Sequence, residues 1–354
     1  MIRRTFLLLL AALFLLTACR PAADGAGKET APADGSALRA ALLEKAEAVT
    51  VSAETVTFEN GNGEWLTLPK GPQNTVILYA SLTTLWYEAG GRASGCLGGS
   101  AATALYREQI GRDITEDAGT VTVAESPAAG RWDVERILAT RPDLILCTNA
   151  MSGYATIDAP ARAAGIPVVV MEYHDFSDYL KWFKVCCHLT GHPELWETVA
   201  QAALDEVVNT LLACRGESAP TVLCLFTGVD TLRANTENTV PGGMLAALGA
   251  VNAVPAVGET EHVTLDPEAM LAADPDMILI QCHTGEEDAR ALVARLYGGS
   301  PVWQSLRAVR EGRVYYLDKA LFHNKPNRRF AEAYRTLAVL LYPEKQAELA
   351  PKSH

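Results

Sequence analysis

The chain has 354 residues, of which 49% are hydrophobic and 20% charged, and its formal net charge at pH 7 is −12. This length is typical of two domains with full-sized cores rather than one. The acidic balance excludes a nucleic-acid-binding protein that depends on a basic face, because such a face must neutralise phosphates.

The first 18 residues are predicted to be a secretory signal peptide. Arg3 and Arg4 precede an unbroken apolar run from Phe6 to Leu16, which is too short to span a bilayer. The segment Leu-Thr-Ala-Cys that ends at Cys19 resembles the signal of bacterial lipoproteins, in which the cysteine becomes the lipidated first residue. An ordinary signal with a chance cysteine is the alternative. Lipidation would hold the folded part outside the cytoplasm, anchored to the cell membrane.

Residues 19–37 are rich in Ala, Gly, Pro and Asp, which predicts a flexible tether. An N-terminal lobe is then predicted over residues 38–180. It begins with a helix over 38–49 and a hairpin from Val56, whose Asn-Gly-Asn-Gly turn is typical of two antiparallel strands. An α/β alternation follows, with strands at TVILYAS, PDLILCTN and IPVVVMEY and helices at TTLWYEAGG, RWDVERILAT and APARAAG.

Residues 181–216 are predicted to form a helical linker, because the segment from Asp175 to Cys214 shows helical periodicity, interrupted at Gly191-His192-Pro193, and no strand pattern. A C-terminal lobe is predicted over residues 217–354. Its expected strands are TVLCLFTG, PDMILIQC and RVYYLD, and its expected helices are GGMLAALG, PEAMLAAD, EEDARALVARLY, 302–309 and FAEAYRTLAVLL.

Two stretches of the chain nearly copy each other: DVERILATRPDLIL from Asp133 and DPEAMLAADPDMIL from Asp266. Each has an Asp that can cap a helix, a Glu two residues later, an apolar helical stripe, Pro-Asp and an aliphatic strand. The same unit therefore occurs once in each lobe. The fold class predicted is α/β, with two Rossmann-like lobes, each a mainly parallel sheet with flanking helices, joined by a long helical linker.

This order of motifs resembles the class III substrate-binding proteins of ABC importers, which carry iron–siderophore complexes, haem, vitamin B12 or bare metal ions. The resemblance covers nearly all of the mature chain and rests on LTLPKGPQNTVIL, LATRPDLIL, AGIPVVV with LTGHPE, LAADPDMILI and PVWQSLRAVREGRVYYLD. It implies a monomeric protein with no enzymatic activity and no cofactor. Such a protein captures an iron complex (siderophore or haem) or cobalamin between its lobes and delivers it to a permease dimer.

The resemblance also implies that Glu135 and Glu268 contact arginines of the permease, one carboxylate from each lobe. The alternative is that each Glu only favours the first turn of its helix through the helix dipole.

Ligands of two-lobed α/β proteins lie on the loops that follow the strands. The aromatic residues there would supply flat apolar surface for a large ring system: Trp86, Tyr87, Tyr154, Tyr173 and Phe322. Core packing is the alternative for Trp86. The basic residues there suit carboxylate, catecholate or phosphate oxygens, with a solvated helix start as the alternative: Arg233, Lys325, Arg328 and Arg329. Three histidines are candidate ligands of a metal or haem iron, or are simply hydrogen-bonded: His174, His262 and His283.

Other functions are less well supported by the residues. A protein for bare metal ions would use several His and carboxylates, often with a His-rich loop, and no such loop is seen in the sequence, so bare metal-ion binding is the alternative and a chelate is favoured. An enzyme is a further alternative, but GxxxxGK[ST], HExxH, GxSxG and GxGxxG do not occur in the sequence. A lipid-tethered adhesin or scaffold would not need a cleft. The seven cysteines other than Cys19 are interpreted mainly as core residues, and one disulfide is left open.

Overall fold

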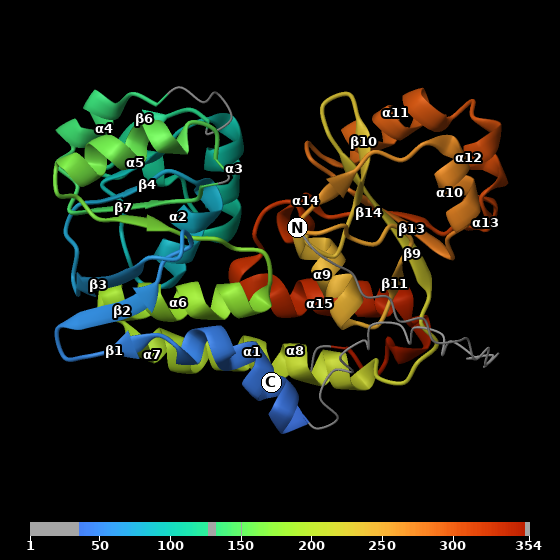
Figure 1. Cartoon of the computed structure of the whole chain (residues 1–354), viewed down its shortest axis with the longest axis horizontal. Coiled ribbons are helices and arrows are strands. Elements are labelled where there is room, and N and C mark those ends of the chain that lie inside the picture. Colours follow the sequence, from blue (N-terminus) through green and yellow to red (C-terminus); the bar gives the residue numbers. More distant parts are fainter. Residues whose placement is uncertain (1–34, 127–131, 150, 351–354) are drawn as a thin grey trace, which may run out of the picture.

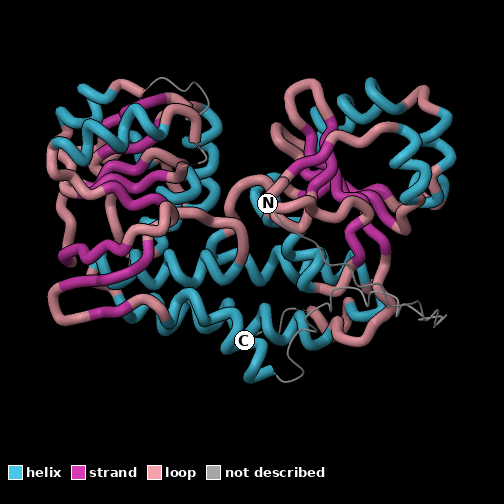
Figure 2. The backbone as a smooth tube through the Cα atoms, in the orientation of Figure 1, coloured by secondary structure: helices cyan, strands magenta, loops and turns pink. Residues whose placement is uncertain are grey.

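The computed structural model describes residues 35–126, 132–149 and 151–350. Two α/β lobes stand side by side on a layer of helices that runs beneath both of them (Figures 1 and 2). The N-terminal lobe has a five-stranded sheet, the C-terminal lobe has a six-stranded sheet, and a separate three-stranded sheet lies beside the helical layer. The predicted two-lobed α/β class is confirmed.

The N-terminal sheet is parallel throughout, in the order β6-β5-β4-β7-β8. All strands except the edge strand β6 are fully buried, as expected of a parallel sheet covered by helices. The chain enters at the central strand β4 and extends the sheet first to one side and then to the other, which gathers the loops after the strands at one edge. The strands are β4 (Thr75–Ile77), β5 (Gly95–Leu97), β6 (Val121–Ala124), β7 (Leu144–Cys147) and β8 (Val168–Val170).

The helices of this lobe follow the sequence pattern only in part. Asp133 caps α4 as predicted, because its carboxylate accepts a hydrogen bond from the backbone N–H of Arg136 at 2.9 Å. Strands β5 and β6 and helix α3 between them were not predicted. The helical elements are α2 (Ala80–Glu88), α3 (Ser100–Gln109), the 3₁₀ turn η1 (Ile114–Glu116), α4 (Val134–Ala139) and α5 (Tyr154–Ala163).

The C-terminal sheet is mixed. Strand β9 pairs in parallel with β13 on one side, and on the other side with β10 (antiparallel) and β11 (parallel). Side chains of β9 alternate between two cores: Cys224 packs into the large core shared with the helical layer, and Leu223 packs into a second core under α10–α13. The strands are β9 (Thr221–Thr227), β10 (Leu232–Asn235), β11 (Val251–Asn252), β12 (His262–Val263), β13 (Met277–Gln281) and β14 (Val314–Leu317).

The repeated motif reappears in the C-terminal helices. Asp266 caps α10 by accepting from the N–H of Ala269 at 2.7 Å, as Asp133 does for α4. The helix expected over 302–309 is divided at Leu306, whose backbone is extended (ψ 135°). The helices are α9 (Val240–Ala247), α10 (Pro267–Ala273), α11 (Glu286–Tyr297), α12 (Pro301–Ser305), α13 (Arg307–Arg310) and α14 (Lys319–Phe322).

The helical layer, called here the helical base, contains the linker and both terminal helices. Helix α6 begins with a capping box between Asp175 and Asp178 and ends at Gly191, whose φ of +84° turns the chain back. Helix α1 packs on α6 and α8, and α15 packs on α8. The elements are α1 (Gly35–Glu47), α6 (Phe176–Thr190), α7 (Pro193–Leu195), the π turn η3 (Trp196–Ala200), α8 (Gln201–Ala213), α15 (Phe330–Leu341) and η5 (Pro343–Lys345).

The three-stranded sheet is the hairpin predicted from Val56, extended by one short strand. Its strands are antiparallel and follow the order β1 (Thr50–Val51), β2 (Thr55–Glu59) and β3 (Trp65–Pro69).

Two predicted boundaries move. The linker helices run from Phe176 to Ala213, whereas the predicted linker covered 181–216, and the chain doubles back at the predicted interruption around Gly191. Helix α1 begins at Gly35, so the last residues of the predicted tether are helical. The predicted signal peptide, Cys19 and the rest of the tether lie outside the described residues.

The two lobes are also connected by the segment between α14 and α15, which crosses from the C-terminal to the N-terminal lobe. Its buried Asn327 donates from Nδ2 to the Ser81 carbonyl at 3.0 Å and to Thr84 Oγ1 at 2.8 Å. Asn327 Oδ1 accepts from the Tyr173 hydroxyl at 3.0 Å. Its positive φ of +51° is a conformation that Asn tolerates better than most residues. We call residues 323–329 the crossing segment.

In the described part of the chain, no helix is both long and apolar enough to cross a membrane. All seven described cysteines are free thiols and buried, as the interpretation as core residues expected.

Candidate functional site

A cavity of about 940 Å³ lies between the lobes, above the helical base. The N-terminal lobe contributes Asn149 and Glu172, which follow β7 and β8, together with His174. The C-terminal lobe contributes Glu237, Asn238, Glu259 and Glu261, and Phe176 and Tyr334 form part of the base. We call this the interlobe cavity.

The β1–β3 hairpin holds the strand end that carries Glu172. Asn60 accepts from the Val170 N–H at 2.7 Å and donates to the Val168 carbonyl at 3.3 Å, and thus takes the place of a further strand beside β8. The N–H of Gly61 bonds the Val170 carbonyl at 2.8 Å. A Cβ at position 61 would stand 2.5 Å from that carbonyl oxygen, so only glycine fits there.

The interlobe cavity is acidic. Its lining includes five carboxylates, and no Lys or Arg is present among the described residues that form it; the carboxylates are Glu172, Asp175, Glu237, Glu259 and Glu261. Asp175 is paired with Lys45 at 3.2 Å. The remaining carboxylates give the cavity a negative potential, which disfavours a strongly anionic ligand.

His174 links the two lobes across this cavity. Its Nε2 lies 3.2 Å from Glu172 of the N-terminal lobe, and its Nδ1 lies 3.5 Å from Glu261 of the C-terminal lobe. Hydrogen bonding to Glu172 first and Glu261 second raises the pKa of His174 to about 9. The same contact lowers the pKa of Glu261. At neutral pH the bridge is therefore an imidazolium between two carboxylates.

A second cavity, of about 550 Å³, is lined by residues at the carboxyl ends of β4, β5 and β6 and by Asn324 of the crossing segment. Lys325 turns the other way: its ammonium donates to the Tyr173 carbonyl and lies 5.2 Å from the centre of the Tyr173 ring. Burial lowers the pKa of Lys325, while the surrounding carboxylates, Glu261 first, act to raise it.

A row of aromatic rings covers the carboxyl end of the C-terminal sheet. Phe226 stacks on His262 with ring centres 5.0 Å apart and on His323 with centres 5.8 Å apart. His283 meets His323 edge-on, and the two rings approach to 3.1 Å between Nδ1 of His283 and Nε2 of His323. The guanidinium of Arg233 lies 5.6 Å from the Phe226 ring centre. We call these five residues the imidazole ladder.

The pKa values of the ladder histidines are lowered from their ordinary value. Burial, helped by nearby cations, lowers the pKa of His323 to about 4 and also lowers the pKa values of His262 and His283. The Nδ1 atom of His262 and the Nε atom of Arg233 are buried without a hydrogen-bond partner in the described structure. In the described ranges, no group of three or more His, Cys, Asp or Glu residues is arranged to hold a metal ion.

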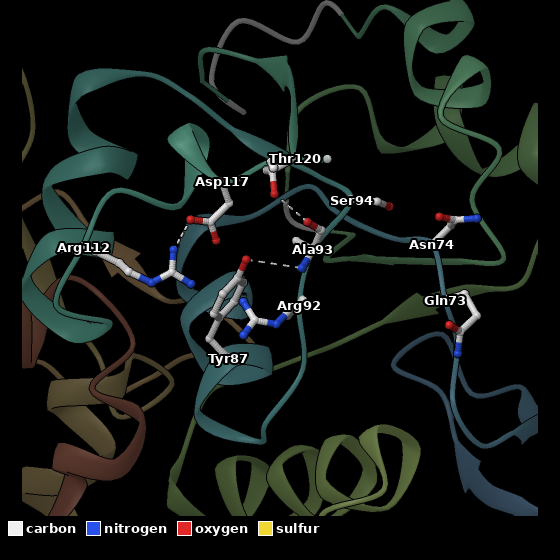
Figure 3. Close-up of a pocket in the computed structure, with 11 residues that line it drawn as sticks. Gln73, Asn74, Tyr87, Arg92, Ala93, Ser94, Arg112, Asp117 and Thr120 are labelled. Atoms are coloured by element: carbon white, nitrogen blue, oxygen red, sulfur yellow. Dashed lines mark hydrogen bonds and ion pairs between the residues drawn. The ribbon is translucent and has the colours of Figure 1, made fainter.

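Another cavity, of about 590 Å³, lies at the opposite edge of the N-terminal sheet (Figure 3). Its lining residues precede β4, β5 and β6, so it lies at the amino ends of the strands. Arg112 contacts Asp117 there, and the Tyr87 hydroxyl accepts from the Ala93 N–H at 3.4 Å. Ligands of open parallel sheets lie at the carboxyl edge, so we do not assign this cavity to the ligand.

The predicted aromatic residues are mostly structural. Trp86 is 1% exposed and its indole N–H donates to the Arg92 carbonyl, so it packs in the core, as the alternative held. Phe322 is 1% exposed, and Tyr173 is 3% exposed and stacks on Phe330. Tyr87 lines the cavity at the amino edge and Tyr154 packs at the start of α5. In the described structure none of these five lines the interlobe cavity.

Three of the four predicted cations contact other groups of the described structure. Arg328 extends towards the buried Glu88 at 3.7 Å, and Arg329 bonds Glu332 at 2.7 Å and Glu108 at 2.9 Å. Lys325 is held by Tyr173, as described above. Of the four predicted cations only Arg233 belongs to the imidazole ladder.

Of the predicted histidines, the structure places His174 in the interlobe cavity and His262 and His283 in the ladder. Sequence reasoning did not single out Glu172, Glu261, Phe226 or His323. Glu172 and Phe226 stand at strand ends, a signal that could have found them. Glu261 comes from a long loop without a pattern, and only the fold brings it to His174.

The predicted docking residues are exposed at matching places. Glu135 and Glu268 are each the second residue of their helices, α4 and α10. In Figure 1 α4 lies at the top of the N-terminal lobe and α10 on the outer flank of the C-terminal lobe, and both are away from the helical base.

Comparison with known proteins places this geometry in a family. The family model described as periplasmic binding protein matches residues 76–321, well over half of the chain. The putative ABC transporter substrate-binding lipoprotein YhfQ of Bacillus subtilis is 22% identical over 266 residues, which cover 72% of this chain and 79% of that protein. The high-affinity heme uptake system protein IsdE of Staphylococcus aureus is 23% identical over 134 residues, 38% of this chain and 46% of that protein.

A solved structure shows the same fold. The periplasmic vitamin B12 binding protein BtuF of Vibrio cholerae superposes with a TM-score of 0.62 at 17% sequence identity. The superposition covers 78% of this chain and 100% of that one.

Proposed function

Because the chain belongs to the periplasmic binding protein family, we propose that it is the substrate-binding protein of an ABC importer, capturing an iron complex (siderophore or haem) or cobalamin between its lobes. It then delivers the cargo to a permease dimer. The proteins it resembles include a heme uptake protein and a vitamin B12 binding protein, which supports a large metal complex as the cargo.

The observation that carries this proposal is the interlobe cavity. Both lobes and the helical base contribute to it, and the N-terminal side chains come from the carboxyl ends of parallel strands. A volume of about 940 Å³ lies at the upper end of the range of ligand pockets and suits a bulky ligand. A ligand held there contacts both lobes at once, so its binding favours one arrangement of the lobes, which a permease can recognise.

We also propose that the mature protein is a monomer anchored outside the cytoplasm through lipid on Cys19. The Leu-Thr-Ala-Cys sequence supports the anchor, and the relative YhfQ is described as a lipoprotein. We expect the protein to perform no chemical reaction of its own.

Native mass spectrometry of the protein purified from its own host tests the capture of a cargo. We expect a single non-covalent ligand of the mass of a metal complex. The same complex, together with haem, cobalamin and ferric siderophores, is then titrated while tryptophan fluorescence is followed.

A matched pair of variants locates the ligand. Asn149→Trp places a bulky ring in the lining of the interlobe cavity and should weaken binding by roughly 5- to 150-fold, the equivalent of about 1–3 kcal/mol of overpacking. Gln73→Trp places the same side chain in the cavity at the amino edge and should leave affinity unchanged. Equal affinities of the two variants, or no ligand of any kind, would contradict the proposal.

A further inference from the structure

The cavity at the amino edge of the N-terminal sheet differs in charge from the interlobe cavity. It has a volume of about 590 Å³, and the described residues that line it include two guanidiniums, Arg92 and Arg112, and one carboxylate, Asp117. The described lining of the interlobe cavity has five carboxylates and no Lys or Arg. In a chain with a formal net charge of −12, the surplus of one positive charge at the amino edge is a local exception. We call this space the amino-edge cavity.

Arg112 is held in place at the wall of the amino-edge cavity. Its Nη1 bonds Asp117, and its Cζ lies 6.0 Å from the centre of the Tyr87 ring. In the view of Figure 3, Arg92 and Arg112 extend towards Tyr87 from opposite sides. In the described structure Asp117 bonds one nitrogen of Arg112, and the side chain is 43% exposed. The remaining N–H groups of this guanidinium can therefore reach a ligand.

Arg92 is fixed by its backbone, whereas its side chain is unpaired. The chain reaches it through Gly90, whose φ is +83°, and Gly91, where an added Cβ would collide with the Trp86 indole. The indole N–H donates to the Arg92 carbonyl at 3.0 Å. The Arg92 guanidinium forms no ion pair or hydrogen bond with any residue that the structure describes. A cation on so constrained a turn loses less conformational freedom when a ligand binds it.

Two neutral donors of the amino-edge cavity are also free. The Tyr87 hydroxyl accepts from the Ala93 N–H at 3.4 Å, and its own proton has no acceptor among the described residues. Burial raises the pKa of Tyr87, so the hydroxyl keeps this proton at neutral pH. The side-chain amide of Asn74 is likewise without a partner in the described ranges. The hydroxyls of Ser94 and Thr120, by contrast, donate to backbone carbonyls at 3.1 and 2.9 Å.

A set of free donors with one surplus positive charge fits a carboxylate. Guanidinium N–H groups bond the two oxygens of a carboxylate in a planar, charge-assisted arrangement. A second negative charge on the ligand would be repelled by Asp117, which disfavours a phosphate dianion. The volume of about 590 Å³ lies within the range of small-molecule pockets, roughly 300–1,000 Å³, and exceeds what a bare ion needs.

We propose that the amino-edge cavity is a second binding site, which takes a small organic acid through one carboxylate held by Arg92, Arg112 and the Tyr87 hydroxyl. The amino-edge cavity and the interlobe cavity share no described lining residue. The organic acid and the cargo can therefore be bound at the same time, and this inference does not depend on the identity of the cargo.

Monocarboxylates and their amides test the proposal. Benzoate, phenylacetate and isobutyrate are each compared with the corresponding primary amide, which has the same shape without the charge, and with phenyl phosphate as the dianion. Titration calorimetry is performed on the full mature chain in a buffer free of carboxylates. We expect at least one of the acids to bind with one molecule per chain. Its amide should bind at least about tenfold more weakly, because charge-assisted hydrogen bonds are lost, and phenyl phosphate should bind no more tightly than the acid.

Substitutions assign the contacts. Arg92→Gln should weaken binding of the acid by about tenfold, and Arg92→Lys should restore only part of the affinity, because an ammonium keeps the charge without the planar fork. Arg310→Gln removes an exposed arginine of α13 that has no ion pair in the described structure, and it should have no effect. Thermal unfolding confirms that each variant is folded.

The pair of tryptophan variants used for the cargo locates the acid, with the opposite result expected. Gln73→Trp obstructs the amino-edge cavity and should weaken binding of the acid, whereas Asn149→Trp should leave it unchanged. The reverse result would place the acid between the lobes and overturn the inference.

Other outcomes also overturn the inference without touching the proposed function. These are the absence of binding by all three acids, equal binding of acids and amides, tighter binding of phenyl phosphate, and unchanged affinity in Arg92→Gln. If instead the acid binds as expected and no cargo is captured, the proposed function falls and the amino-edge site stands.

Discussion

At the scale of single residues, His174 contacts one carboxylate close to it in the sequence and one that is distant. Glu172 lies two positions before it, but Glu261 comes from the other lobe and from a loop without a sequence pattern. Because each carboxylate belongs to a different lobe, the charge on this imidazole contributes to the attraction between lobes as well as to folding. The bridge is partly exposed, so salt and a bound ligand both weaken it.

The pH dependence of stability follows from this bridge. The pKa of His174 is raised to about 9 in the folded protein, against roughly 6.5 in an unfolded chain. The stabilisation is therefore complete below about pH 6.5 and is lost as the pH rises towards 9. We expect the difference in unfolding free energy between the wild type and His174→Gln to shrink over this interval, measured by urea denaturation from pH 5 to 10. Glu261→Gln should narrow the pH interval over which this stabilisation is lost. If the unfolding free energies of the wild type and His174→Gln change in parallel with pH, the assignment to His174 is wrong.

At the scale of elements, the crossing segment, which ends in a 3₁₀ turn over Asn327–Arg329, forms buried hydrogen bonds with the N-terminal lobe. Asn327 satisfies three polar groups of the N-terminal lobe, namely the Ser81 carbonyl and the hydroxyls of Thr84 and Tyr173. Ser81, Thr84 and Tyr173 are buried, so each loses a hydrogen-bond partner if Asn327 is replaced. A segment of the C-terminal half thus becomes part of the N-terminal lobe, so the lobes are held by side-chain contacts as well as by the linker.

Replacing this asparagine tests the role of the crossing segment. Asn327→Ala should lower the free energy of unfolding by roughly 3 kcal/mol, because buried polar groups lose their partner and alanine fits a positive φ less well. Asn327→Gly relieves the backbone while losing the same hydrogen bonds, and separates the two causes. Asn62→Ala, in the exposed hairpin turn, should change stability by less than about 0.5 kcal/mol. Urea denaturation provides the measurement, and a neutral Asn327→Ala would show that the segment does not tie the lobes.

At the scale of the whole molecule, the duplication places α4 and α10 at corresponding points of the two lobes. Each helix starts with an Asp cap and carries an exposed Glu as its second residue. A permease with two-fold symmetry presents two equivalent surfaces, and a duplicated single chain can offer one carboxylate to each of them. We therefore propose Glu135 and Glu268 as docking residues, remote from the interlobe cavity lining.

Charge reversal tests this docking. The double variant Glu135→Lys with Glu268→Lys should abolish uptake of the cargo by cells and leave the affinity of the isolated protein for its ligand unchanged. Only a modest loss of stability is expected, about 0.3–1 kcal/mol for each helix start. Glu44→Lys with Glu47→Lys reverses the same charge on exposed residues of α1 in the helical base and should support normal uptake. Weaker ligand binding in the first pair, or normal uptake, would contradict the assignment.

Local patterns in the sequence predicted the long elements and the architecture. The strands around TVLCLFTG and PDMILIQC are apolar runs bounded by turn residues, and the caps Asp133 and Asp266 sit three residues before the N–H groups they bond. Strand β5 was missed because it has only three residues and contains glycine, so its burial, not its composition, makes it a strand. Strand β10 (LRAN) forms a local hairpin with β9 and lies between β9 and β12, and its four residues show no apolar strand pattern that would predict it.

The residues of the candidate site could be predicted only in part, because the sequence does not show which side chains pack in the core. Loops can be placed at strand ends from the sequence, and His174 and His283 were proposed in that way, whereas Arg233 lies within strand β10. Whether a side chain faces ligand or core depends on packing, so Trp86 and Phe322 lie in the core. Arg328 and Arg329 extend towards or bond carboxylates far away in the chain. The sequence had suggested basic residues at the ligand site. The acidic character of the cavity was not predicted, because its carboxylates come from separate loops.

The sequence by itself determined the duplicated α/β plan, the helical connection and the caps, since these depend on periodicity and on contacts between near neighbours. Only the tertiary structure decided the acidic character of the interlobe cavity, the lobe-to-lobe bridge at His174 and the meeting of His283 with His323. His283 and His323 are 40 positions apart in the chain, and His174 and Glu261 are 87 positions apart. Bringing such distant residues together costs loop-closure entropy, so these contacts form only when the whole chain folds.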